Sequence, residues 1–344
     1  MEYNIDLLVA GCDTACRHCY VNGGPAPEMP YEAFVRCMEK LRPAFECLGD
    51  RLSFTLDNEV YHHPQALRIL EYVAEHAASN YYHHGSTTGI AILGHPDREA
   101  ILSLLEQSGW REVSFAIHGG TENHDRIVNH PGALLTLKRA AELFKAHGFE
   151  VWLSLMASKA LLRDRVEVEQ MMGDIPHDNV LPVIPDYYPT PRLRRYQSIR
   201  CNAEETEAFI RLARDLGGVD APRYCSESQV WRSLCEGGFS PDWTKRQIAF
   251  FHIDHRLDFH VGNTGSSIRD CGNVDDLSSE KILKIIESAT DNYYETSEIH
   301  YADLEQAIDT RGVKRSEEDY TYPDPISCLI AMIDNTRQIN VSGA

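Results

Sequence analysis

Three cysteines near the start of the chain have side chains and a spacing suited to redox chemistry. Cys12, Cys16 and Cys19 lie in the segment CDTACRHCY, with the spacing C-x3-C-x2-C and no further cysteine nearby. Three thiolates on one short loop bind three irons of a cubane [4Fe–4S] cluster and leave its fourth iron open. A zinc site with His18 as the fourth ligand and metal-free buried thiols are the alternatives. The open iron favours a redox enzyme.

The composition indicates the setting for such a site. The 344 residues carry a net charge of −19, which gives no general attraction to nucleic acid or to an anionic membrane. We therefore expect neither as a partner. No stretch approaches the ~18 apolar residues of a spanning helix, and the first residues lack a secretion signal. Ten cysteines are too sparse for a disulfide scaffold in this chain, so we expect a reducing, cytoplasmic location.

The elements that must position these cysteines alternate along the first half of the chain. The expected first strand covers residues 3–10, and the cysteine loop follows at its carboxyl end. Further strands are expected at residues 52–56, 83–87, 113–117, 150–156 and 180–184, and helices at residues 31–48, 64–78, 97–107, 133–147 and 166–172. This alternation implies a parallel sheet or barrel, whose active face is formed by the loops after the strands.

The second half of the chain is less regular. A basic loop near residues 189–195 precedes expected helices at residues 203–216, 279–289, 302–310 and 326–336 and a strand pair at residues 248–253 and 257–261. We place a domain boundary near residue 200. The first domain covers residues 1–200, and a smaller cap with a helical tail covers residues 201–344.

Five segments, in order along the chain, resemble the radical S-adenosylmethionine (SAM) superfamily. They are the cysteine loop with Tyr20 after it, and residues 54–64 (FTLDNEVYHHP), 86–89 (STTG), 115–119 (FAIHG) and 124–132 (HDRIVNHPG). The resemblance covers about residues 3–190. It implies an α/β fold, a partial (β/α)6 TIM-type barrel with a smaller α+β C-terminal cap.

The resemblance implies two cofactors, a [4Fe–4S] cluster held by the three cysteines and SAM bound to its open iron. An electron donor such as flavodoxin or ferredoxin is implied as a partner. Glu59 is the expected acceptor for the ammonium of SAM, although Asp57 and Asn58 replace the two glycines usual before it, which alters the site. The SAM-binding candidates are Tyr20, Asn58, Glu59, Ser86, Thr88, His118 and Ser154. His118 is also the one candidate for a catalytic role.

The C-terminal part resembles a degenerate SPASM or twitch domain, a module that carries auxiliary clusters in many relatives. The resemblance rests on residues 235–238 (CEGG), 251–260 (FHIDHRLDFH), 271–274 (CGNV) and 277–282 (LSSEKI). Cys225, Cys235 and Cys271 are the candidates for a second iron–sulfur cluster. A module that kept its shape and lost its metal is the alternative, and we favour it, because the closely spaced later cysteines are missing.

The substrate is the least constrained part of the prediction. Arg192, Arg194 and Arg195, with Tyr187 and Tyr188, are candidates to bind a carboxylate or phosphate, and pairing with the protein's own carboxylates is the alternative. The first strand begins at residue 3 with no peptide-binding domain before it, which favours a small polar metabolite in a biosynthetic pathway. A maturase of ribosomally made peptides is the main alternative. A non-catalytic iron–sulfur electron carrier or sensor is another.

Overall fold

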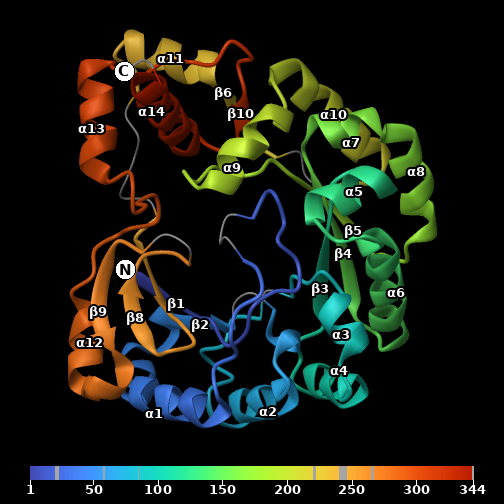
Figure 1. Cartoon of the computed structure of the whole chain (residues 1–344), viewed down its shortest axis with the longest axis vertical. Helices are drawn as coiled ribbons and strands as arrows, with labels where there is room; N and C mark the ends of the chain where they lie inside the picture. Colours follow the sequence, from blue (N-terminus) through green and yellow to red (C-terminus); the bar gives the residue numbers. More distant parts are fainter. Residues whose placement is uncertain are drawn as a thin grey trace.

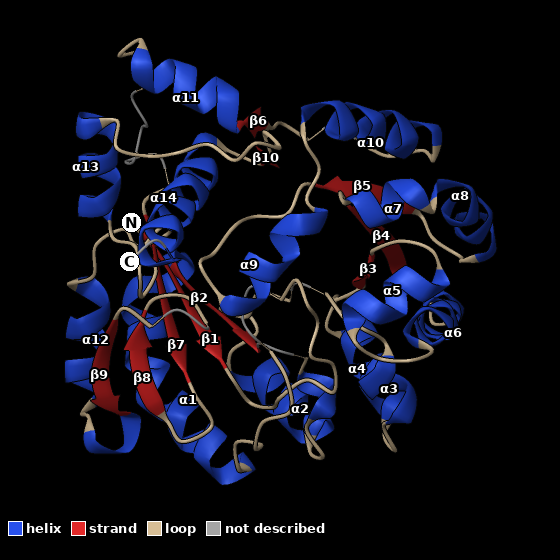
Figure 2. Cartoon of the chain, turned by 45° about the horizontal axis from the view of Figure 1, so that its top comes forward, coloured by secondary structure: helices blue, strands red, loops and turns tan. Residues whose placement is uncertain are grey.

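Parallel strands surround the centre of the molecule (Figures 1 and 2). The computed structural model describes residues 1–19, 23–56, 59–83, 85–219, 222–239, 246–264 and 267–342. In it, β1 (Glu2–Leu7) pairs in parallel with β2 (Leu52–Leu56). A second parallel sheet contains β3 (Glu112–Ile117), β4 (Glu150–Met156) and β5 (Asn179–Val183) in that order.

The third expected strand, at residues 83–87, is reduced to two single bridges. Tyr81 bridges to Phe54 of β2, and Ser86 bridges to Ser114 of β3, both in parallel. These bridges join the two sheets into one curved wall, so the predicted α/β fold with a partial barrel is confirmed. Beside the second bridge, Gly85 has a φ of 63° and lies so close to the Glu112 carbonyl that a side chain would not fit there.

Helices cover the outer face of this wall. The apolar residues of α1 (Tyr31–Leu48), such as Phe34 and Leu41, are fully buried. The other helices of this half are α2 (Ala66–His76), α3 (Ile90–Gly94), α4 (Arg98–Gln107), α5 (Thr121–Val128), α6 (Ala133–Ala146), α7 (Lys159–Arg163), α8 (Arg165–Asp174), α9 (Pro191–Tyr196) and α10 (Ala203–Asp215). Strand β1 shows the same division, because Ile5 and Leu7 are buried towards the helices while Asn4 and Asp6 line the interior.

The C-terminal part continues the first sheet. Strand β7 (Ile248–Ile253) pairs in parallel with β1, and β8 (Asp258–Val261) and β9 (Arg269–Asn273) follow in antiparallel order, which gives the strand order β2-β1-β7-β8-β9. Helix α12 (Ser279–Glu287) packs beside α1 at the outside (Figure 1). The predicted domain boundary at residue 200 stays a prediction, and the larger apolar core contains residues from both sides of it.

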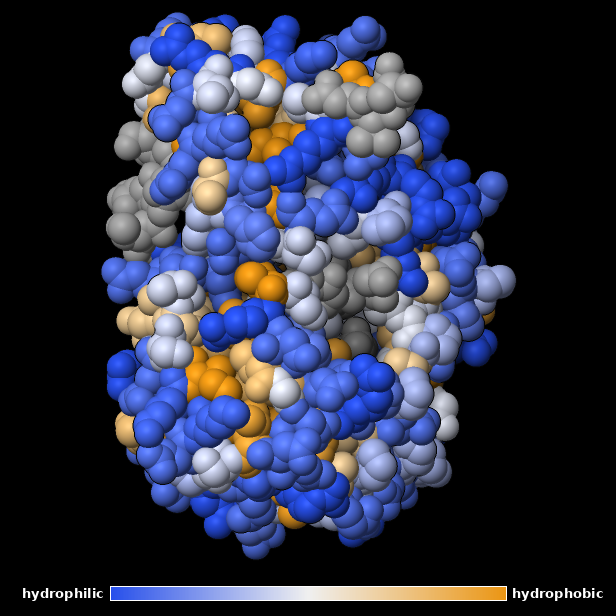
Figure 3. Space-filling view, turned by 60° about the vertical axis from the view of Figure 1, so that its left-hand side comes forward, coloured by the Kyte–Doolittle hydropathy of each residue, from blue (hydrophilic) through white to orange (hydrophobic). Residues whose placement is uncertain are grey.

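A second, smaller core closes one end of the molecule. It is built around α14 (Pro325–Ser342), with α11 (Glu227–Cys235), α13 (Tyr301–Thr310) and the short pair β6 (Cys225–Ser226) and β10 (Thr321–Tyr322). Among the described residues, every helix is too short or too polar to cross a lipid bilayer. The face drawn in Figure 3 is mostly hydrophilic, and polar groups separate its apolar ones.

The basic segment after β5 is a helix rather than the loop expected from its sequence. The side chain of Thr190 accepts a hydrogen bond from the backbone N–H of Leu193, and Pro191 occupies the first turn of α9. Both are favoured helix-start positions, since proline needs no hydrogen-bond partner there. The helix lies across the open side of the barrel (Figure 1).

Candidate active site

A cavity of about 700 Å³ lies inside the barrel. Its wall consists of inward-facing side chains of the strands and of the loops that follow them. It brings together most of the site residues expected from the sequence: Cys12, Cys16, Cys19, Glu59, Ser86, Thr88, His118 and Ser154. Tyr20 and Asn58 were expected here too, and both lie outside the described residues.

The three thiols are half-buried on a loop that the rest of the chain holds in place. The backbone N–H of Cys12 donates to Gly24 O at 2.9 Å, and that of Arg17 donates to Ile127 O at 2.8 Å. Gly11 makes this possible, because a Cβ there would lie 2.3 Å from the backbone nitrogen of Ala26. The loop is therefore fixed at both ends against the barrel.

The hydroxyl of Thr14, which sequence reasoning missed, lies between two of the thiols. Its Oγ1 is 3.0 Å from Cys12 Sγ and 3.3 Å from Cys16 Sγ, while Cys19 Sγ accepts from the Gly23 N–H at 3.1 Å. Burial raises the pKa of Cys16 to about 12, and the neighbouring thiols add to the increase. Burial and then Glu59 raise the pKa of Cys12. Without a metal these groups are thiols, so metal binding must displace their protons.

Glu59 is held by the segment that was expected to bind SAM. Its carboxylate accepts hydrogen bonds from the Thr87 hydroxyl, from the Thr88 hydroxyl at 2.9 Å and from the Thr88 N–H at 3.2 Å. Glu59 is 6 % exposed and has a φ of 118°, a conformation that normally favours glycine. Backbone strain of this kind persists only where the surroundings enforce it and is concentrated at functional sites.

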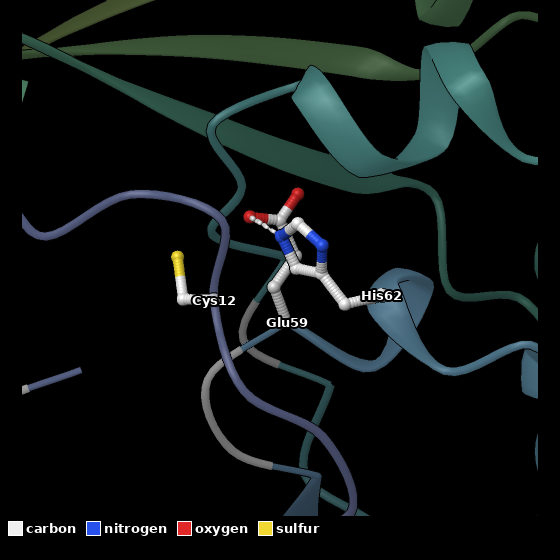
Figure 4. Close-up of side chains that lie close together, drawn as sticks. All are labelled: Cys12, Glu59 and His62. Carbon is white, nitrogen blue, oxygen red and sulfur yellow. Dashed lines mark ion pairs between the residues drawn. The ribbon is translucent and has the colours of Figure 1, made fainter. Parts of the chain in front are cut away.

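His62 connects Glu59 to the cysteine loop. Its Nε2 accepts from the Asp13 N–H at 3.2 Å and lies 3.8 Å from the Glu59 carboxylate, while its Nδ1 lies 3.1 Å from the Asp13 carboxylate. Ligand atoms of Cys12, Glu59 and His62 lie within 4.8 Å of one another (Figure 4). Because both ring nitrogens of His62 contact Asp13, we interpret His62 as a residue that holds the cysteine loop against the segment after β2.

Three histidines lie side by side at the end of β3. The ring of His118 is 4.0 Å from that of His18 and 5.6 Å from that of His124, centre to centre. Burial, together with its two neighbours, lowers the pKa of His118 well below its ordinary value, and burial lowers those of His18 and His124 to about 4. His118 is 1 % exposed, and its Nδ1 has no hydrogen-bond partner. Burial thus favours the neutral form of these imidazoles, of which the sequence analysis proposed only His118 for SAM binding or catalysis.

Residues 7–167 match the sequence model of the radical SAM superfamily. These residues form a radical SAM domain. The chain is therefore an enzyme, as predicted, and not a non-catalytic iron–sulfur carrier or sensor. The cofactors of this superfamily are a [4Fe–4S] cluster and SAM, so the two predicted cofactors are confirmed.

Solved structures of radical SAM enzymes share the fold of this chain. Native anSMEcpe with bound SAM is 14 % identical with a TM-score of 0.54 over 99 % of both chains. The same protein with SAM and the Cp18Cys peptide is 13 % identical with a TM-score of 0.53 over 100 % of this chain and 99 % of the other. Streptococcus suis SuiB bound to its precursor peptide SuiA is 10 % identical with a TM-score of 0.52 over 95 % and 76 %. In the SAM-bound form of SuiB, the match spans only 60 % of that chain. A search of curated sequences found no match.

The donor set of this radical SAM enzyme fits the cluster of the superfamily. Three sulfurs of one loop line the cavity, and no other cysteine of the described residues does so. The buried carboxylate of Glu59 lies within 4.8 Å of the Cys12 sulfur. This set provides one thiolate ligand to each of three irons of the cluster and leaves the fourth iron without a protein ligand.

The predicted substrate residues are mostly engaged elsewhere. Arg194 donates twice to Asp334 at 2.8 Å, and Tyr187 donates to the same carboxylate at 2.5 Å. Arg195 donates to a carbonyl of its own helix, and Arg192 donates to the Gly23 carbonyl of the cysteine loop. Of these five candidates, only Tyr188 lines the cavity. The structure therefore brings the arginines to the protein's own acceptors.

The candidates for a second cluster are not brought together. Cys225 lies on β6, Cys235 at the exposed end of α11 and Cys271 on β9, at the far edge of the first sheet. Within the described ranges, the only group of three metal-binding side chains that lie close together is the one at Cys12. The second cluster and the SPASM or twitch resemblance stay predictions.

Proposed function

We propose that this radical SAM enzyme cleaves SAM reductively and removes a hydrogen atom from a small polar metabolite in a biosynthetic pathway. The observation that carries the proposal is that three thiols and the buried carboxylate of Glu59 line one cavity of about 700 Å³. The backbone of Glu59 is strained, as described above. Cys12, Cys16 and Cys19 hold the [4Fe–4S] cluster in this proposal. When bound, the cluster supplies the electron that splits SAM into methionine and a 5′-deoxyadenosyl radical, the species that takes the hydrogen atom.

The protein's own groups bind and orient SAM. The Glu59 carboxylate accepts hydrogen bonds from the ammonium of SAM, and the two threonines beside it fix its direction. Hydrogen bonds between charged groups are stronger than neutral ones, which makes Glu59 the main polar anchor. The hydroxyls of Ser154 and Ser86 are neutral groups that contact the rest of the cofactor. Ser154 Oγ is also hydrogen-bonded to Ser114 Oγ, 3.0 Å away inside the barrel. The barrel wall excludes water from the reacting atoms.

The volume of the cavity supports a small substrate. Sites for drug-sized ligands occupy about 300–1,000 Å³, and this cavity of about 700 Å³ lies within that range, which favours small ligands. A peptide is the second candidate, because SuiB and anSMEcpe, which share the fold, hold peptides in their structures. Such a peptide would place one side chain in the cavity. We expect an electron donor such as flavodoxin or ferredoxin, and a cytoplasmic location.

Anaerobic reconstitution with iron and sulfide tests the proposal. Addition of dithionite and SAM should release methionine and 5′-deoxyadenosine, measured by mass spectrometry, and changing Cys12, Cys16 and Cys19 to Ala should abolish both. Cys47→Ala, an exposed cysteine of α1, is the matched control and should retain them. No cleavage by a protein that holds about four irons would contradict the proposal. About four irons in the triple variant would instead reveal a cluster in the C-terminal part.

Glu59→Gln tests the anchor separately from the cluster. Loss of one charge-assisted hydrogen bond is worth about 1.5–3 kcal/mol, so the Kd for SAM should rise by roughly 10- to 150-fold. Equilibrium dialysis of SAM against the reconstituted protein measures this, with iron content checked in parallel. Glu122→Gln on the surface of α5 is the control. An unchanged Kd in Glu59→Gln would show that the ammonium binds elsewhere.

A further inference from the structure

Three polar side chains lead from the cavity into its wall near the end of β5. Asp186 follows this strand, lines the cavity and has an exposed side chain. Ser327, in the first turn of α14, is 4 % exposed. Asp324, just before that helix, is half-buried and is not among the described residues that line the cavity. One carboxyl group of this set therefore meets the cavity and the other lies outside its lining.

The hydroxyl of Ser327 lies between the two carboxyl groups. Its Oγ is 3.0 Å from Asp186 Oδ1 and 3.0 Å from Asp324 Oδ2. A hydroxyl has one hydrogen to donate and can also accept, whereas an ionised carboxylate can only accept. Ser327 therefore donates to one carboxylate, and its other contact is a hydrogen bond only when the second carboxyl group carries a proton. The two distances fit a pair of carboxyl groups that holds one proton.

Asp324 is the better placed of the two groups to keep the negative charge. Its Oδ1 accepts hydrogen bonds from the backbone N–H groups of Ile326 at 2.8 Å and Ser327 at 3.0 Å, at the start of α14. The start of a helix stabilises a negative charge in this way. The carboxyl group of Asp186 contacts only Ser327 through a hydrogen bond within the described part of the chain. The proton therefore belongs on Asp186, with Ser327 donating to Asp324.

The other charged groups around Asp186 do not bind its carboxyl group directly. Loss of water to the surrounding protein, and then the charge of Asp324, raise the pKa of Asp186, although one side of it faces the cavity, and two arginines lower it. Arg200 donates to the Asp186 backbone carbonyl at 2.9 Å. Arg246 lies over the ring of Tyr293, 4.6 Å from its centre. Both cations act from a distance, so they offset the effect of Asp324 only in part.

We infer that Asp186, Ser327 and Asp324 form a proton relay between the cavity and the outside, with Asp186 as the acid–base residue that meets the substrate. This inference rests on the proposed function and deepens it. An O–H group of the substrate gives its proton to Asp186 Oδ2. At the same time the proton on Asp186 Oδ1 moves to Ser327 Oγ, and the proton of Ser327 moves to Asp324 Oδ2, which releases it to water. One proton enters for each that leaves and no electron moves, so the relay needs no co-reactant.

The chemistry of the proposed function gives this relay a purpose. Loss of a hydrogen atom from a carbon that carries a hydroxyl group leaves a radical whose O–H is far more acidic than that of the parent alcohol. A carboxyl group placed beside it accelerates such a proton transfer. The relay therefore suits a substrate with a hydroxyl group at the reacting carbon.

NMR of the reconstituted enzyme, labelled with ¹³C at its aspartate carboxyl groups, tests the relay without SAM, reduction or turnover. Asp186→Asn and Asp324→Asn assign the two signals. In the wild type, the Asp186 signal should titrate above the ordinary aspartate value of about 3.9. Titration at or below that value would overturn the inference.

Ser327→Ala tests the direction of the hydrogen bond. In the relay, Ser327 accepts from protonated Asp186, so the variant should reduce the proton affinity of Asp186 by about three- to tenfold. If Ser327 instead donates to an ionised Asp186, the variant should increase that affinity. An increase, or no change, would overturn the inference. Ser288→Ala, at an exposed serine just after α12, is the matched control and should leave the titration unchanged.

The outcome does not depend on the proposed function. If Ser327→Ala does not fold, the titration of Asp186 in the wild type still decides whether this group holds the proton. Failure of the wild type to cleave SAM after reduction is a separate result, which would contradict the proposed function.

Discussion

Replacing Arg200 by methionine removes the cation that organises the segment after β5. Arg200 is 1 % exposed and donates to Gln197 Oε1 at 2.6 Å, Pro185 O at 2.5 Å, Thr321 O at 3.1 Å and Asp186 O at 2.9 Å. Each buried acceptor that loses its donor costs about 1–3 kcal/mol. Removing a buried charge returns part of its desolvation cost. We therefore expect Arg200→Met to lower the free energy of unfolding by about 4 kcal/mol.

Urea denaturation, followed by circular dichroism, measures this loss for the wild type and the variant prepared side by side. Arg195→Met is the matched control, because Arg195 is exposed on α9 and donates only to a carbonyl of that helix. It should change the free energy of unfolding by less than about 0.5 kcal/mol. A loss below about 1 kcal/mol in Arg200→Met, or a loss equal to that of the control, would show that the hydrogen bonds of Arg200 do not stabilise the fold as argued.

Three further changes have defined outcomes. Gly89→Ala should destabilise the protein by about 2–4 kcal/mol in the same urea titration, and Gly109→Ala by only about 1 kcal/mol. Both glycines have a φ near 79°, but an added Cβ would lie 2.5 Å from the Ala140 Cβ at Gly89 and would meet nothing within 4 Å at Gly109. Burial lowers the pKa of His252 from 6.5 to about 4. The unfolded chain therefore binds the proton first as the pH falls, and stability should drop by up to about 1.4 kcal/mol per pH unit between those values, a slope that His252→Gln should reduce. Asp334→Asn should cost about 2–4 kcal/mol, since its carboxylate accepts three hydrogen bonds from α9 and the segment before it.

Local patterns predicted much of the barrel half. Helix α1 has the predicted bounds, Tyr31–Leu48, although Pro43 lies inside it, because its apolar spacing outweighs one lost hydrogen bond. Strands β2 and β4 also have their predicted bounds. The helix at Pro191 was missed despite a usable signal, the Thr-Pro pair that begins it. Arginine-rich composition suggested a loop there, but the start signal decides the backbone.

Contacts between distant segments could not be predicted from these patterns. The placement of Glu59 followed from its neighbours in sequence, yet its hydrogen bonds to Thr87 and Thr88 depend on how two strand ends meet. Likewise, no local sequence pattern indicates that Asp334 on α14 accepts hydrogen bonds from Arg194 and Tyr187. Both are products of the tertiary fold, in which a carboxylate accepts hydrogen bonds from the donors that packing brings closest.

The pairing of β1 with β7 affects how the protein is made. Glu2 pairs with Ile248, so one edge of the first strand stays open until nearly three quarters of the chain has left the ribosome (Figure 2). The cysteine loop follows that strand directly, and its final position depends on the same late partner. Contacts of such long sequence separation form slowly and leave an unpaired strand edge exposed meanwhile. Newly made chains are therefore exposed to aggregation and to thiol oxidation before the iron site is complete, and expression at low temperature with limited oxygen should improve the yield of protein able to bind iron.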